Sequence, residues 1–121
     1  MKGDHVYLAH IRDEAQRALD YTRDGRDAFF SDAKTQDAVI RNIEVIGEAT
    51  KCLGDELKAA HSDVPCRQIA GMRDTLIHRY FGVKLDLVWQ VVERDLPGFK
   101  ARIEAIFSAL PPPPAEPETP S

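Results

Sequence analysis

Residues 71–82 read G-M-R-D-T-L-I-H-R-Y-F-G, and this stretch concentrates more chemically active side chains than any other part of the chain. The apolar residues Met72, Leu76 and Ile77 interleave with polar ones at a spacing that predicts a helix. Such a helix can pack against its neighbours and still present polar groups. Those groups are Arg73, Asp74, His78, Arg79 and Tyr80.

Helix geometry decides which of these side chains can meet. Asp74 and His78 are four positions apart, so a carboxylate–imidazole hydrogen bond is available to them. Arg73 and His78 lie roughly 140° apart around an ideal helix and therefore on different faces. A site that uses both needs an arginine that reaches round, a helix that loosens after Ile77, or a second copy of the helix across a two-fold axis. The third arrangement predicts a homodimer with a composite site.

The sequence before this stretch predicts two long helices. Leu8, Ile11 and Ala15 belong to the apolar stripe of the first, over residues 5–23, with Asp4 available as its N-cap. Gly25 interrupts the pattern. The second helix begins with Ser31 or Asp32 as its cap and reaches about residue 53. Gly54 then ends it, and a short helical turn follows near residues 55–60.

The sequence after residue 60 predicts two or three more helices. The residues S-D-V-P at 62–65 mark the start of the helix that carries the central stretch, which Gly82 ends. A further helix follows from about Leu85, Pro97 breaks or kinks it, and Asp95 is placed to cap the restart. The fold predicted from these elements is an all-α, up-and-down bundle of four to five helices.

The domain organisation follows from composition. A chain of 121 residues predicts one domain, here residues 1–110. The segment 111–121 reads P-P-P-P-A-E-P-E-T-P-S, and it cannot contribute to a core. We expect it to be an extended, mobile tail.

Charge and hydropathy exclude several classes of protein. The formal net charge is −4 with no basic stripe, so we expect no DNA partner and no coating of long nucleic acids. No apolar run is long enough for a membrane helix or a signal peptide, which predicts a cytoplasmic protein without a membrane partner. Cys52 and Cys66 form no zinc motif, and we interpret them as reduced thiols.

Two further pairs of side chains are of types that can bind a metal ion. Glu44 and Glu48 lie four positions apart on one helix face and could serve acid–base or metal chemistry, although a solvated helix face is the simpler interpretation. His5 and His10 could bind a metal, but they fit ordinary surface residues better. We therefore predict no metal site and no cofactor.

Four segments together resemble one known family. The sequence R-D-T-L-I-H-R-Y fits the pattern R-x-x-x-x-H-x-Y of the HepT-like branch of the HEPN superfamily. T-Q-D-A-V-I-R-N-I-E-V-I-G-E-A, I-A-G-M-R-D and V-W-Q-V-V-E-R-D-L-P support the match, in the expected order over residues 4–110. The resemblance implies a homodimeric, metal-independent endoribonuclease. It also implies the toxin of a type VII toxin–antitoxin pair, whose MntA-type nucleotidyltransferase antitoxin silences it by transferring AMP to the motif tyrosine.

The resemblance also implies a role for each motif residue. Arg73 and His78 become catalytic, Asp74 supports the site, and Tyr80 is the hydroxyl that receives AMP. The chemistry agrees, because His78 can move a proton near neutral pH and Arg73 can hold phosphate oxygens. The expected product is a 2′,3′-cyclic phosphate. The transferred AMP would pair with Arg73 or Arg79 and compete with substrate phosphate.

Two other functions fit the same residues. A non-catalytic subunit could use Arg73, His78 and Tyr80 to bind a nucleotide, or present substrate to a nucleotidyltransferase, without cutting RNA. A purely structural helical adaptor could use the motif for internal ion pairs. Cleavage of RNA separates the first from a ribonuclease. Loss of stability in Arg73→Ala, as large as any loss of function, would identify the second.

Overall fold

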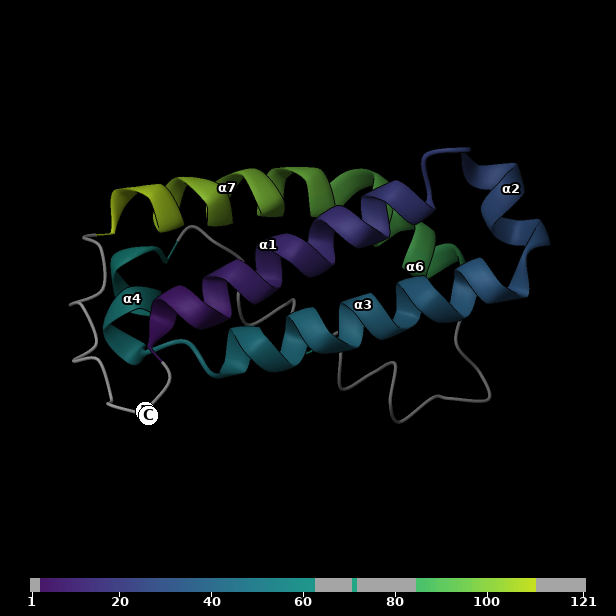
Figure 1. Cartoon of the computed structure of the whole chain (residues 1–121). Coiled ribbons are helices and arrows are strands. Elements are labelled where there is room, and N and C mark those ends of the chain that lie inside the picture. Colours follow the sequence, from purple (N-terminus) through teal and green to yellow (C-terminus); the bar gives the residue numbers. More distant parts are fainter. Residues whose placement is uncertain (1–2, 63–70, 72–84, 111–121) are drawn as a thin grey trace, which may run out of the picture.

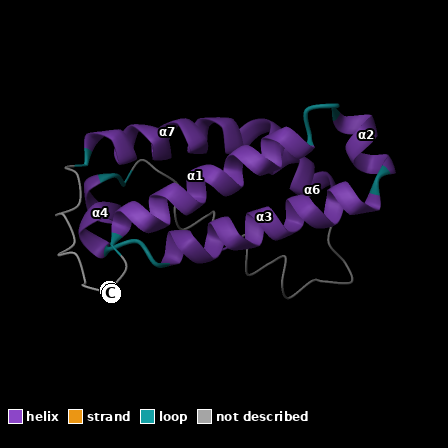
Figure 2. Ribbon diagram, in the orientation of Figure 1, coloured by secondary structure: helices purple, strands orange, loops and turns teal. Residues whose placement is uncertain are grey.

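The computed structural model describes residues 3–62, 71 and 85–110. Every regular element in these ranges is a helix, and they contain no strand, as Figure 2 shows. The all-α prediction is therefore confirmed. The predicted start at residues 62–65, the central stretch from residue 72 and the tail 111–121 lie outside the described residues, apart from Ser62.

Three long helices form the body of the bundle. They are α1 (Asp4–Tyr21), α3 (Ala33–Lys51) and α7 (Leu96–Ala109). α1 packs against both of the others and runs in the opposite direction to them (Figure 1). This is the up-and-down arrangement that the sequence predicts. No helix in the described part of the chain has the length and apolar content to cross a membrane.

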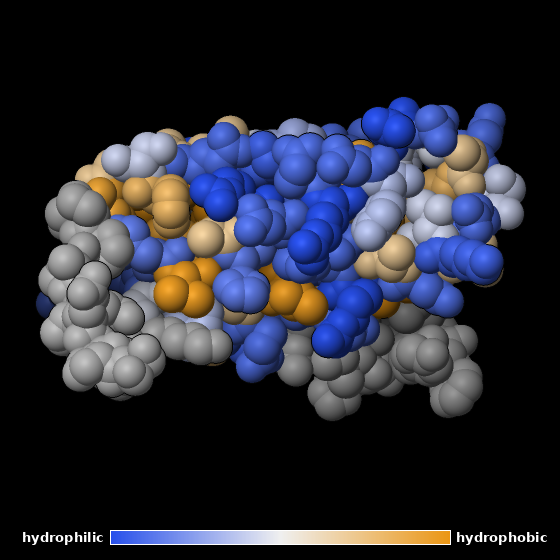
Figure 3. Space-filling view, in the orientation of Figure 1, coloured by the Kyte–Doolittle hydropathy of each residue, from blue (hydrophilic) through white to orange (hydrophobic). Residues whose placement is uncertain are grey.

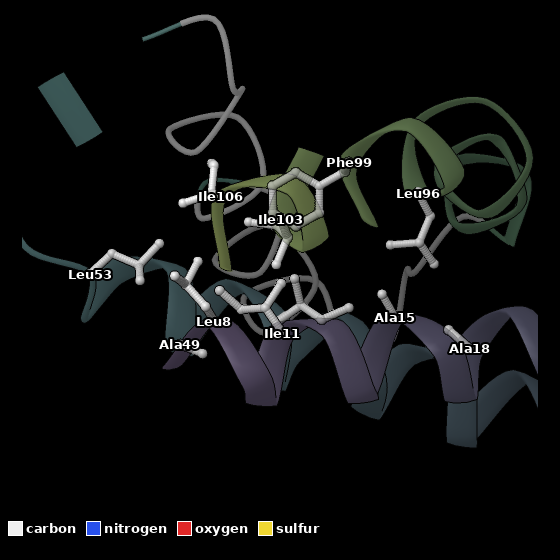
Figure 4. Close-up of a cluster of buried hydrophobic side chains, with 11 residues drawn as sticks. Leu8, Ile11, Ala15, Ala18, Ala49, Leu53, Leu96, Phe99, Ile103 and Ile106 are labelled. Atoms are coloured by element: carbon white, nitrogen blue, oxygen red, sulfur yellow. The ribbon is translucent and has the colours of Figure 1, made fainter. Parts of the chain in front are cut away.

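The larger apolar core lies between these helices. Side chains of α1 and α7 point toward one another in Figure 4. Leu8, Ile11 and Ala15 are fully buried, as the apolar stripe predicts. Burying a leucine or isoleucine side chain stabilises the fold by about 1.5–3 kcal/mol, so this stripe is a main source of α1's stability. The outer face drawn in Figure 3 is largely hydrophilic, with a few separate hydrophobic patches.

The start of α3 follows local sequence chemistry. Asp32 is its N-cap: the carboxylate accepts hydrogen bonds from the Lys34 backbone N–H at 3.0 Å and the Thr35 hydroxyl at 2.8 Å. The first bond satisfies a backbone N–H that the first helical turn leaves unpaired, and the second joins the Asp32 carboxylate to a side chain of the same turn. Of the two predicted caps, Asp32 is therefore the correct one. Ser31 instead donates its hydroxyl to the Ala28 carbonyl.

The predicted N-cap of α1 is wrong. Gly3 occupies that position, and Asp4 is the first helical residue. The Asp4 carboxylate accepts a hydrogen bond from the Gly54 backbone N–H at 2.8 Å, 50 positions away in the sequence. It thereby fastens the start of α1 to the corner before the short helix α4 (Asp55–Ala60), which lies where the sequence predicts it. α3 itself ends at Lys51, before Gly54.

A second apolar cluster closes the other end of the bundle. It joins α3 to α2 (Arg26–Ser31), a short helix that the sequence analysis missed, and to α6 (Leu85–Gln90) with the π-helical turn η2 (Val91–Asp95). Its buried members are Phe29, Val39, Ile43, Val88, Val91 and Val92. Gly25 reverses the chain before α2 with φ of 98°, a conformation that favours glycine.

Pro97 does not break the helix. The chain stays helical from residue 85 to 109, and Pro97 is the second residue of α7. Proline lacks an N–H and clashes with the carbonyl four residues earlier. The wider turn η2 precedes this position, and Leu96 donates its N–H to the Val91 carbonyl, five residues back. Asp95 occupies the N-cap position of α7, as predicted, but its side chain makes no capping hydrogen bond.

Candidate functional site

The predicted catalytic and modification residues lie outside the described part of the chain. These are Arg73, Asp74, His78, Arg79 and Tyr80. Cys66, predicted to be a reduced thiol, also lies outside the described residues. Gly71, which opens the central stretch, is helical and exposed. The roles of these residues therefore remain predictions. The described residues form the helical bundle outside the central stretch. They also contain other polar side chains that contact one another.

The weaker metal candidates are ordinary helix residues. Glu44 is partly buried on α3 and lies 3.7 Å from the Arg41 guanidinium, whereas Glu48 is exposed. His10 is exposed, and the His5 ring packs edge-on against Phe107 at 5.9 Å. Among the described residues, no three His, Cys, Asp or Glu side chains converge as metal ligands would. Nothing here makes Glu44 and Glu48 a metal site.

Of the two cysteines, Cys52 lies in the described part of the chain. Cys52 is exposed and free, as the interpretation as a reduced thiol requires. It lies beside Tyr7, whose pKa is raised chiefly by desolvation and further by the hydrogen bond and charge of Cys52. A phenol is neutral near pH 7 even at its ordinary pKa, so this upward shift changes no charge there, and we interpret the pair as a structural contact between α1 and the end of α3.

A polar contact between α1 and α3 was not predicted. Asn42 is only 6% exposed and donates its amide N–H to Glu14 Oε2 at 2.7 Å. The other Glu14 oxygen accepts from Arg17 Nη1 at 2.7 Å. Asn42 Oδ1 is buried and has no hydrogen-bond partner among the described residues. The sequence held a signal for this site, because position 42 falls on the same helix face as Val39 and Ile46.

A polar cleft opens where α2 meets α6 and η2. It has a volume of about 350 Å³, and we call it the Trp89 cleft. Its lining consists of Arg26, Asp86, Trp89, Gln90, Glu93 and Arg94. Arg26 and Asp86 approach to 3.5 Å across 60 positions of sequence. Five of its residues, from Asp86 to Arg94, recur at helical spacing and share one helix face, but only the packing of α2 beside them brings Arg26 into the cleft.

Comparison with known proteins identifies relatives of this chain by sequence. The family model of HepT-like ribonucleases, described as Ribonuclease HepT-like, matches residues 11–106. A Thermococcus cleftensis protein named probable ribonuclease HepT is 41% identical over 88% of this chain and 98% of its own. A putative RNase of Caldanaerobacter subterraneus is 36% identical over 88% and 96%.

A longer relative also contains this unit. A Methanocaldococcus jannaschii protein named gamma-glutamylcyclotransferase and putative RNase is 44% identical over 90% of this chain. The chain corresponds to 50% of that protein's length. No solved structure matches the chain.

Proposed function

Because this chain belongs to the HepT-like ribonuclease family, we propose that it is an endoribonuclease and the toxin of a toxin–antitoxin pair. One observation carries the proposal. The family match spans residues 11–106 and includes the R-x-x-x-x-H-x-Y motif at Arg73, His78 and Tyr80. Relatives that align along almost their whole length are named as ribonucleases.

The proposed reaction uses the nucleophile that RNA already contains. The 2′-hydroxyl next to the scissile phosphate attacks phosphorus, and the bond to the 5′-oxygen of the next nucleotide breaks. His78 moves a proton, a role typically worth about 10²–10⁴-fold in rate. Arg73 holds two phosphate oxygens and stabilises the developing negative charge. Asp74 orients the imidazole, and the product carries a 2′,3′-cyclic phosphate. No step requires a metal ion.

A homodimer would complete this site. Each chain supplies one motif histidine, which can both remove the proton of the 2′-hydroxyl and protonate the leaving oxygen only with the help of water or a second subunit. Two copies of the motif helix across a two-fold axis would bring His78 of one subunit near Arg73 of the other. The 140° separation of Arg73 and His78 on one helix would then cease to be an obstacle.

We assign Tyr80 the regulatory role. An MntA-type nucleotidyltransferase antitoxin would transfer AMP from ATP to the Tyr80 hydroxyl, with release of pyrophosphate. The bound AMP places an anion two residues from His78. It would pair with Arg73 or Arg79 and so exclude the substrate phosphate.

The test compares the purified protein with His78→Ala on total cellular RNA in EDTA. Mass spectrometry first establishes that Tyr80 is unmodified. We expect the unsubstituted protein to cut RNA, the variant to leave it intact, and the new 3′ ends to carry cyclic phosphate. RNA left intact by a folded, unmodified dimer would contradict a general nuclease and favour the nucleotide-binding subunit. Activity lost in EDTA and restored by a divalent metal would contradict the metal-independent mechanism.

A further inference from the structure

The Trp89 cleft contains an aromatic wall that its surroundings hold in place. Phe29 packs against the indole with ring centroids 5.5 Å apart and the planes tilted by 37°. The indole Nε1–H donates a hydrogen bond to Glu93 Oε2 at 2.6 Å. A fixed aromatic ring that lines an open cleft suits base stacking, because every nucleobase offers an aromatic face.

The two arginines of the cleft differ in their partners. The Arg26 guanidinium lies 4.4 Å from the centre of the Phe30 ring and 3.5 Å from the Asp86 carboxylate, so it is largely committed. Arg94 is exposed and makes no hydrogen bond or ion pair with any described residue. Its guanidinium is therefore available to an anion, and its planar geometry matches phosphate.

Glu93 adds a criterion for selecting the base. One of its oxygens accepts the indole N–H, and the carboxylate keeps further acceptor positions but has no donor. Adenine and cytosine present exocyclic amino groups to such an acceptor and guanine presents one at C2, whereas uracil has a carbonyl oxygen where cytosine has its amino group. The Glu93 side chain beside the stacked base would favour the amino-bearing bases.

The size and position of the cleft fit a single nucleotide. Its volume of about 350 Å³ lies at the lower end of the usual range for small-molecule sites, about 300–1,000 Å³. Glu93 and Arg94 belong to the π-helical turn η2, and single π turns within helices are frequent at functional sites.

We propose that the Trp89 cleft binds one unstacked, amino-bearing nucleotide of single-stranded RNA, with its base against Trp89 and its phosphate on Arg94. The inference rests on the proposed function only in taking RNA as the substrate. The cleft would thereby select where the RNA lies relative to the motif. A single phosphate contact of this kind is compatible with a chain of net charge −4, which attracts long nucleic acids weakly.

The test uses the fluorescence of Trp89, which is the only tryptophan of the chain. The whole 121-residue chain carries His78→Ala so that RNA stays intact during titration at fixed ionic strength. We expect saturable quenching by short oligoadenylate and oligocytidylate, and at least about 5-fold weaker binding of oligouridylate, which corresponds to about 1 kcal/mol. Equal affinities for all three would overturn the role of Glu93.

Two variants locate the contacts without disturbing the core. Arg94→Ala removes an exposed side chain, and we expect oligoadenylate affinity to fall about 10-fold. Arg23→Ala, just after α1, removes one positive charge from an exposed residue outside the cleft lining and should change the affinity less than about 2-fold. Glu93→Gln exposes an amide donor and should shift the preference toward oligouridylate. Equal effects of the two arginine variants would refute a specific phosphate contact.

Free AMP distinguishes the source of the nucleotide. We expect AMP to bind much more weakly than oligoadenylate, because it lacks the neighbouring nucleotides. Equal affinity would assign the cleft to a free mononucleotide and overturn the RNA assignment. The two proposals can fail separately. Quenching without any RNA cleavage by the unsubstituted protein would sink the ribonuclease alone, whereas cleavage without quenching and without an Arg94 effect would sink the cleft alone.

Discussion

The substitution Asn42→Asp tests the buried contact between α1 and α3. It replaces the amide that donates to Glu14 Oε2 at 2.7 Å with a second carboxylate, at a position only 6% exposed. Two ionised carboxylates cannot share this site, so the folded protein must bind a proton there. The introduced carboxyl then has a raised pKa in the folded state.

The loss of stability follows from the free energy needed to keep that carboxyl protonated. Holding one carboxyl of the pair protonated at pH 7, against an unfolded pKa of about 3.9–4.3, costs about 4 kcal/mol at about 1.36 kcal/mol per pH unit. We expect Asn42→Asp to lose about this much free energy of unfolding at pH 7. Because the pKa of the introduced carboxyl is raised in the folded state, the loss of stability increases with pH. The loss disappears below about pH 4, where both states are protonated, and it grows as the pH rises.

The assay is urea unfolding followed by far-ultraviolet circular dichroism at pH 7 and pH 5, with each variant compared with the unsubstituted protein at the same pH. The chain supplies a matched control, because Gln16 donates the same amide bond to Asp20 Oδ1 at 2.8 Å on an exposed surface. Gln16→Glu should cost less than about 0.5 kcal/mol. Equal losses in the two variants, or a loss for Asn42→Asp that does not shrink at pH 5, would refute the buried contact.

Other substitutions test the core, the backbone and the helix cap. Leu8→Ala empties a fully buried position and should cost about 2–5 kcal/mol in urea unfolding. Gly25→Ala should cost about 1–3 kcal/mol through backbone strain at φ of 98°, whereas Gly98→Ala, in α7 with open space around its Cα, should stabilise by about 0.5–1 kcal/mol. Asp32→Ala should lower the melting temperature by removing the cap of α3. The Thr35 hydroxyl bond lowers the pKa of Asp32, so this difference should be full above about pH 4 and vanish as the pH falls through the lowered pKa.

Contacts between neighbouring residues account for what could be predicted about the fold. The period of 3.6 residues places Leu8, Ile11 and Ala15 on one face of α1, so their burial follows from spacing. Asp32 could be identified as a candidate cap because its partners, Lys34 and Thr35, are two and three positions away. The family motif at Arg73, His78 and Tyr80 is likewise a local pattern. Its identification required no tertiary structure, and its geometry stays a prediction.

Contacts between residues that are distant in the sequence account for the features of the fold that could not be predicted. Asp4 has the chemistry of an N-cap, yet its carboxylate accepts a hydrogen bond from a backbone N–H 50 positions away. The six residues of α2 carry too short a pattern to predict a helix, and the burial of Phe29 against Trp89 stabilises them. Pro97 signals a break, but the π turn before it lets the helix continue.

The sequence alone therefore determined the helical class of this protein, the direction of its apolar faces and its family, because these depend on residues within a few turns of each other. The tertiary structure decided which polar groups meet. The Glu14–Asn42 contact joins residues 28 positions apart, and the Trp89 cleft joins Arg26 to Asp86 across 60. Helix periodicity specifies the face on which a side chain lies, but only the packing of one helix against another specifies its partner.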